Sequence, residues 1–117
     1  MSSESASLAR LYEAFNARDI DAALAVMHPD VKWPNGWEGG YVVGHKAVRD
    51  YWTRQWAEID PTATPKDFER LADGQIRVLV HLRAVNGNGE LLWENMASHT
   101  YAFDSSKIRS MEIGKSE

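Results

Sequence analysis

Hydrophobic residues in the first half of the chain recur with the period of an α-helix. Three segments show the spacing of three and four residues that gathers apolar side chains on one helix face. The first covers residues 8–15. The second begins at Asp19, whose side chain can cap it, and ends at Pro29, which cannot continue helical hydrogen bonding. The third covers residues 45–57, so the pattern predicts three helices.

The second half of the chain has the pattern of β-strands. The sequence Asn86-Gly87-Asn88-Gly89 is a strong hairpin signal, because Asn and Gly tolerate the positive φ angles of tight hairpins. A short strand is predicted before a long loop rich in glycine and aromatic residues, at 31–33 and 34–44. Four further strands are predicted at residues 66–72, 75–85, 91–103 and 107–113. Helices followed by an antiparallel meander are typical of the α+β class. We expect one domain over residues 1–117, with helices packed on a curved antiparallel sheet that encloses a pocket.

Composition and charge narrow the classes of function. The 117 residues include no cysteine, which excludes disulfides, thiolate nucleophiles and cysteine-bound zinc. The formal net charge is −4 and no stretch is rich in Lys and Arg, which argues against a nucleic-acid partner. No apolar run approaches membrane-spanning length, and the polar residues 1–7 lack the apolar segment of a secretory signal. We therefore expect no membrane partner and a cytoplasmic location.

Three segments resemble a known superfamily. They read LYEAFNARDID at residues 11–21, HPDVKW at 28–33 and GHKAVRDYW at 44–52. They are similar to the SnoaL-like and ketosteroid-isomerase-like branch of the nuclear transport factor 2 (NTF2-like) superfamily. The resemblance implies a cone of three N-terminal helices on a strongly curved antiparallel sheet around a pocket, and a homodimer. This fold hosts isomerases, cyclases, dehydratases, epoxide hydrolases and non-catalytic binders, so the resemblance does not name a reaction.

The residues at the ketosteroid isomerase positions differ from those of that enzyme. The resemblance places Asn35 at the position of the catalytic base and Leu11 at that of the oxyanion tyrosine, with Tyr12 next to it. It places His99 near the position of the protonated aspartate, and Trp52 at that of the residue supporting the tyrosine. All the acid and base groups of that mechanism are therefore replaced, which argues against steroid isomerisation.

His99 is the first candidate for chemistry. Strand alternation places it on one face with Asn95, Ala97, Tyr101 and Phe103. The large aromatic residues indicate that this is the concave face. A histidine there could act as a general base or acid near neutral pH. The alternative is a buried histidine held by the hydrogen bond of a neighbour.

His81 lies on a strand whose register is ambiguous. Apolar alternation over residues 76–82 would turn His81 outward. The register implied by the resemblance turns Leu79, His81 and Arg83 toward the cavity. It leaves the apolar face on the outer side of the sheet, buried in a homodimer. We favour this second register. It places His81 beside His99 around one cavity, as in a dehydratase of the superfamily that uses a histidine pair.

Other polar and aromatic residues complete the predicted site. Asn35 could bind a substrate oxygen, although Pro34-Asn35-Gly36 is equally typical of a turn. Tyr12 could offer its hydroxyl to the cavity or belong to the core. A set of large apolar residues is predicted to line the pocket and to suit a flat ring or polyketide-like ligand, unless it only forms the core. These residues are Phe15, Trp33, Trp37, Trp52, Trp56, Leu79 and Tyr101.

No cofactor or metal is expected. The four histidines lack a short metal-binding spacing, and no glycine-rich loop matches a phosphate or dinucleotide motif. We expect a pocket protein that acts on a small hydrophobic molecule by proton transfer, as a cofactor-free isomerase, dehydratase or cyclase. The alternative is a non-catalytic ligand-binding or dimeric scaffold domain. The missing pocket carboxylate favours the alternative, whereas the histidines and tryptophans favour the enzyme.

Overall fold

Three helices and six strands make up residues 3–115, the part of the chain that this computed structural model describes. The helices are α1 (Ser3–Asn16), α2 (Ile20–Ala25) and α3 (His45–Glu58). The strands are β1 (Met27–Pro34), β2 (Tyr41–Val43), β3 (Asp60–Arg70), β4 (Ile76–Val85), β5 (Leu91–Asp104) and β6 (Lys107–Lys115). The predicted α+β class and its three helices are confirmed. None of the described helices is long and apolar enough to cross a membrane.

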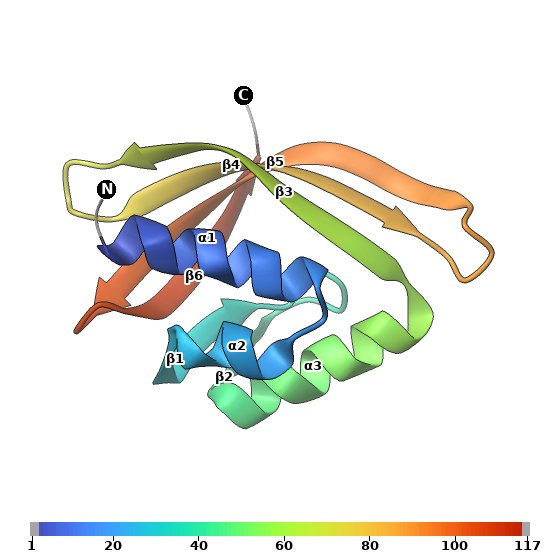
Figure 1. The fold of residues 1–117 in the computed structure, drawn as a ribbon, viewed down its shortest axis with the longest axis horizontal. Helices are drawn as coiled ribbons and strands as arrows, with labels where there is room; N and C mark the ends of the chain where they lie inside the picture. Colours follow the sequence, from blue (N-terminus) through green and yellow to red (C-terminus); the bar gives the residue numbers. More distant parts are fainter. Residues whose placement is uncertain (1–2, 116–117) are drawn as a thin grey trace.

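The six strands form one curved sheet in the order β2-β1-β6-β5-β4-β3. β1 and β6 run parallel, and all other neighbours are antiparallel. Figure 1 shows the sheet arching over the three helices, with α1 lying across its concave side. The space between the arch and the helices holds the core and the site described below.

The helices bury the faces that their sequence pattern predicts. Leu8, Leu11 and Tyr12 of α1 are at most 4% exposed, and Val48 and Trp52 of α3 at most 1%. Burial of each large apolar side chain contributes about 1.5–3 kcal/mol to folding. These side chains therefore fix both helices against the sheet.

The second helix is shorter than predicted. Asp19 caps it as expected, because its carboxylate accepts a hydrogen bond of 3.1 Å from the Ala22 amide. The helix ends at Ala25 rather than near Pro29, and β1 begins at Met27. The Val26 carbonyl accepts a hydrogen bond from the Ile108 amide of β6, so sheet pairing takes over where the helix was expected to continue.

Two further strands were only partly predicted. β3 begins at Asp60 and includes Pro61 and Pro65, whereas the sequence predicted a strand from residue 66. β3 lies at the edge of the sheet, where a proline is tolerated because one side of the strand has no neighbour to bond with. The pairing of β3 with β4 shifts in register after Pro65. The short strand β2 was predicted as part of a loop.

The register predicted for β4 from the resemblance is wrong. Ile76, Val78 and Val80 are at most 2% exposed and belong to the core, so the face with the apolar alternation points inward. Leu79 and His81 consequently point to the outer face of the sheet. The larger free-energy gain from burying the continuous apolar row decides the register.

Candidate functional site

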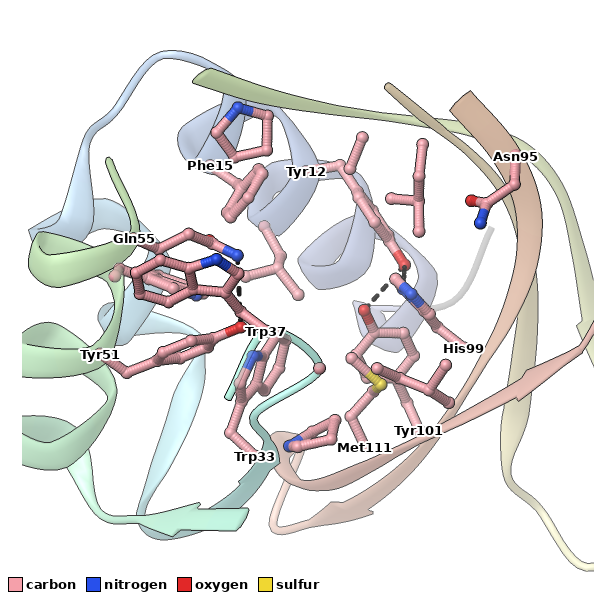
Figure 2. Close-up of a pocket in the computed structure, with 18 of the residues that line it drawn as sticks. Tyr12, Phe15, Trp33, Trp37, Tyr51, Gln55, Asn95, His99, Tyr101 and Met111 are labelled. Carbon is pink, nitrogen blue, oxygen red and sulfur yellow. Dashed lines mark hydrogen bonds between the residues drawn. The ribbon is translucent and has the colours of Figure 1, made fainter. Parts of the chain in front are cut away.

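A cavity of about 480 Å³ lies between α1, α3 and the concave face of the sheet (Figure 2). It is lined by residues from α1, from the middle and later turns of α3, from the loop after β1, and from all strands of the sheet except β2. Much of its wall is aromatic, formed by Tyr12, Phe15, Trp33, Trp37, Tyr51, Trp52, Trp93 and Tyr101. No Asp, Glu, Lys or Arg within the described part of the chain lines it. The cavity is therefore uncharged and suits an apolar ring system.

The aromatic wall is held by edge-to-face contacts. The ring centroids of Trp33 and Trp52 lie 5.7 Å apart at an interplanar angle of 89°, and those of Phe15 and Trp52 lie 5.4 Å apart. Trp33 also lies 6.2 Å from Tyr101, so it connects the α3 side of the cavity to β5. Five residues predicted to line the pocket do so: Phe15, Trp33, Trp37, Trp52 and Tyr101.

The other two residues predicted to line the pocket do not. Trp56 stacks behind Trp52 with ring centroids 5.5 Å apart, and the Arg18 guanidinium lies 4.9 Å from its ring. Trp56 is one helical turn beyond Trp52 and therefore supports the wall from outside. Leu79 lies on the outer face of β4 because of the register described above.

Three polar side chains meet at one end of the cavity. The Tyr12 hydroxyl lies 2.8 Å from Nδ1 of His99 and 2.7 Å from the Tyr101 hydroxyl. Figure 2 shows the Tyr12 hydroxyl between the two β5 side chains. Tyr12 is 4% exposed, His99 7% and Tyr101 0%. The sequence predicted that Tyr12 and His99 belong to the site, and the structure brings them into direct contact.

The burial of Tyr101 fixes where the protons of this cluster lie. Its hydroxyl is fully enclosed and has only the Tyr12 oxygen as a hydrogen-bond partner among residues 3–115, so it must donate there to avoid an unsatisfied buried donor. Tyr12 then donates its own hydrogen to Nδ1 of His99. Because a neutral imidazole carries one hydrogen, that hydrogen lies on Nε2.

Burial keeps all three groups uncharged at neutral pH. It lowers the pKa of His99 from 6.5 to about 4, and it raises the pKa of both Tyr12 and Tyr101 above the ordinary value of 10.0. Protonation of Nδ1 would also displace the hydrogen that Tyr12 donates. His99 is therefore a neutral imidazole and a poor base at pH 7.

The second ring nitrogen of His99 faces open space. Nε2 has no hydrogen-bond partner among residues 3–115, and it is not one of the fully enclosed, unpartnered polar atoms. His99 lines the cavity, so the Nε2–H group can donate to a molecule bound there. The cluster thus presents one preorganised, neutral donor to the cavity.

His81 does not join this cluster, and the predicted histidine pair is wrong. Its Nε2 lies 2.7 Å from a Glu94 carboxylate oxygen on the outer face, and its side chain is 30% exposed. In the sheet His81 pairs with Met96, whereas His99 pairs with Val78. The two histidines are on opposite faces, because the apolar row of β4 faces inward.

Asn35 takes the turn role that its sequence context equally allowed. Its side-chain oxygen accepts hydrogen bonds of 3.2 and 2.7 Å from the amides of Trp37 and Glu38. Its side-chain nitrogen donates to the Glu38 carboxylate at 2.9 Å. Asn35 does not line the cavity, but it positions Gly36 and Trp37, which do.

Several lining residues were missed as site residues. Tyr51 and Gln55 reach the cavity from α3, Asn95 from β5, and Met111 from β6. The signal for Gln55 was present in the sequence, because a polar amide lies on the otherwise apolar face of the predicted third helix. Among residues 3–115 no group of three or more His, Cys, Asp or Glu could hold a metal ion.

Comparison with known proteins identifies the family. The SnoaL-like domain matches residues 8–111, and the chain therefore belongs to the family of SnoaL-like domains. This confirms the resemblance in the sequence. No curated protein matches the chain.

Solved structures share the whole fold. An NTF2-like protein of unknown function from Burkholderia pseudomallei is 25% identical with a TM-score of 0.85, covering 99% of this chain and 92% of the other. A Mycobacterium tuberculosis protein solved with estradiol-17beta-hemisuccinate is 20% identical with a TM-score of 0.83, covering 97% and 93%. The Δ5-3-ketosteroid isomerase of a Mycobacterium species is 17% identical with a TM-score of 0.83, covering 99% and 95%.

Proposed function

We propose that this protein binds a small, uncharged, aromatic carbonyl compound and promotes proton transfer on it, in an isomerisation or cyclisation without a cofactor. In this proposal Nε2–H of His99 donates to the carbonyl oxygen. Tyr12 and Tyr101 hold His99 in the donating tautomer. The observation that carries the proposal is the Tyr101–Tyr12–His99 hydrogen-bond chain at the end of an uncharged aromatic cavity.

The lining determines the class of ligand. An ion would lose its hydration without gaining a partner of opposite charge, because no charged side chain of the described residues lines the cavity. Flat rings suit walls such as Trp33, Trp37 and Trp52. The solved relative that carries an estradiol derivative supports a ring ligand for this fold.

A neutral donor fixed in advance stabilises a developing enolate. When a water molecule or hydroxide that enters the cavity takes a proton from the carbon next to a carbonyl, the electron pair of the C–H bond moves to the oxygen as an enolate. A hydrogen bond at that oxygen strengthens as the negative charge grows. A neutral imidazole can serve as such a donor. With a pKa of about 4, His99 is too weak a base to remove an ordinary C–H proton at pH 7. The site therefore suits substrates whose C–H group is already acidic, as in polyketide-like dicarbonyl compounds.

The second candidate function is binding without catalysis. It is favoured by one observation, that no carboxylate of the described residues lines the cavity and no other lining group can act as a strong base at neutral pH. A binding protein would use the same His99 donor for recognition. The two functions differ in turnover and not in the pose of the ligand.

The carbonyl stretch of bound chalcone tests the proposed pose. In the wild-type protein we expect the infrared band to shift to lower frequency than in an apolar solvent, because an N–H donor weakens the C=O bond. His99→Phe should abolish the shift and weaken binding about tenfold, the loss expected for one buried hydrogen bond. His81→Phe is the matched control on the outer face and should keep the shift. An unshifted band in the wild-type protein would contradict the proposal.

Hydrogen–deuterium exchange on β-tetralone separates the two candidate functions, because its C1–H group is acidified by both the carbonyl and the fused ring. The wild-type protein should accelerate exchange at the carbon next to the carbonyl, and His99→Phe should remove the acceleration. If chalcone binds with a shifted carbonyl band while exchange of β-tetralone stays at the rate of buffer alone, the protein is a binder and not an enzyme.

We also propose a homodimer through the outer face of the sheet. Trp93 and Asn95 line the cavity, so alternation along β5 turns Leu92 and Met96 outward. These two apolar side chains are 46% and 37% exposed. Exposed apolar residues on a regular sheet face favour burial against a second copy of the chain.

A further inference from the structure

Gln55 is a buried polar residue that the His99 cluster does not use. Among residues 3–115 the buried polar or charged residues are Asn35, Gln55 and His99. Asn35 is fully engaged in its turn, and His99 is bound by Tyr12. The Gln55 side chain makes one long hydrogen bond of 3.4 Å, from Nε2 to the Tyr51 hydroxyl. Its Oε1 atom has no hydrogen-bond partner among these residues, and it is not fully enclosed.

Tyr51 adds a free donor next to this amide. Its hydroxyl oxygen accepts from Gln55 and is also faced by the backbone amides of Trp37 and Gly36, and no acceptor for its hydrogen occurs in the described part of the chain. Burial raises the pKa of Tyr51, so the phenol keeps this hydrogen at neutral pH. Both residues line the cavity. Together they offer one acceptor, Oε1 of Gln55, and one donor, the Tyr51 hydroxyl. A molecule bound in the cavity can therefore form hydrogen bonds with both groups.

The Gln55–Tyr51 pair lies across the cavity from His99. Figure 2 shows Gln55 and Tyr51 on α3 at one side, and His99 with Tyr12 and Tyr101 at the other. Trp33 lies between the two sides, because its ring is 5.7 Å from that of Trp52 and 6.2 Å from that of Tyr101. The cavity volume of about 480 Å³ lies within the range of small-molecule binding sites. The cavity therefore has room for a ligand of two rings between the two polar sides.

We propose that Gln55 and Tyr51 form a second polar subsite that binds a hydroxyl group, so that the ligand is a flat hydroxy-carbonyl compound with its two oxygens at opposite ends. A hydroxyl fits because it donates to the Gln55 oxygen and accepts from the Tyr51 hydroxyl at the same time. A carboxylate would face the Gln55 oxygen without a cation to balance it. This inference rests on the proposed function, which places the carbonyl at His99.

Chalcone and para-hydroxychalcone form the probe pair, since they differ by a hydroxyl on the ring remote from the carbonyl. Affinities are measured by tryptophan fluorescence quenching at a pH where the phenol is neutral. The wild-type protein should bind para-hydroxychalcone about tenfold more tightly than chalcone. Gln55→Leu, of similar size, and Tyr51→Phe should each remove most of this preference, measured as the ratio of the two affinities within each variant. Gln75→Leu lies in the turn before β4, outside the cavity, and is the matched control that should keep the preference.

The outcomes separate this inference from the proposed function. Equal affinity of the wild-type protein for the two probes overturns the hydroxyl subsite, whether or not the variants fold. The hydroxyl subsite is also overturned if Gln55→Leu weakens the binding of both probes equally, or weakens the binding of neither. If chalcone binds with a shifted carbonyl band but the hydroxyl preference is missing, only this inference fails. If neither probe binds, the proposed function and this inference fall together.

Discussion

His99 keeps its neutral form because it is buried beside two phenols and no carboxylate of the described residues lines the same cavity. Burial penalises the imidazolium, and the Tyr12 hydrogen already occupies Nδ1. As a result His99, a type of residue that often accepts protons, is instead a hydrogen-bond donor fixed in one tautomer.

Stability should fall as the pH is lowered through the titration of His99. An unfolded chain binds a proton on this histidine near pH 6.5, whereas the folded protein does so only near pH 4, so protonation favours the unfolded state between these values. Above pH 6.5 the contribution of His99 to the free energy of unfolding is fully present, and below about pH 4 no further stability is lost through His99. The difference corresponds to about 3 kcal/mol. Urea unfolding at pH 7 and pH 4 measures it.

His99→Asn is the control for that measurement. The carboxylates titrate in the same pH range in both proteins, so the difference between the two proteins isolates His99. The variant should lose less stability on acidification than the wild-type protein. Equal losses would show that His99 titrates near its ordinary pKa and would contradict the neutral donor.

The positions of Tyr12 and His99 in the site could be predicted from the sequence, but their roles could not. Strand alternation and the aromatic face identified the concave side at His99. The proton assignment depends on contacts between residues that are 87 and 89 positions apart, and it needs Tyr101 to be fully buried. Neither the contacts nor the burial follows from local patterns.

The loop between β1 and β2 is shaped by the Asn35 side chain and carries part of the cavity wall. Asn35→Ala would remove two hydrogen bonds to loop amides and one to Glu38. We expect a loss of about 1–3 kcal/mol in the free energy of unfolding. Chalcone binding should also weaken, because Gly36 and Trp37 line the cavity. Urea unfolding and fluorescence titration measure the two effects.

Asn88→Ala is the control for the loop. Asn88 lies in the exposed β4–β5 turn and does not line the cavity, so this change should alter neither stability nor binding by more than a few tenths of a kcal/mol. A fully stable Asn35→Ala protein with unchanged chalcone affinity would show that the loop does not depend on this side chain.

The sequence predicted the type of an element where its hydrophobic residues followed either the helix or the strand period. It also predicted which face of a strand points inward where the burial of apolar residues was the criterion. The apolar row from Ile76 to Leu82 indicated the correct inward face of β4, and the resemblance misled because it replaced that physical criterion. The predicted strand began too late for β3, because Pro61 and Pro65 argue against a central strand. The sequence does not show that β3 lies at the edge of the sheet, where prolines are tolerated.

The whole molecule separates a cavity face from an outer face on the same strands. Along β5, Asn95 and His99 contribute to the cavity, while Glu94 and Met96 face the other way. A change on the outer face can therefore alter assembly without touching the ligand. This separation allows the dimer proposal to be tested independently of the proposed function.

Met96→Lys should dissociate the proposed homodimer. Lysine at this position would place two copies of a desolvated charge in an apolar contact between the outer faces, which is costly without a partner. Light scattering at micromolar concentration should report a dimer for the wild-type protein and a monomer for the variant, with chalcone affinity unchanged. Val43→Lys, at the exposed edge strand β2, should remain dimeric. A monomeric wild-type protein would refute the outer-face dimer, and a Met96→Lys dimer would move the interface to another surface.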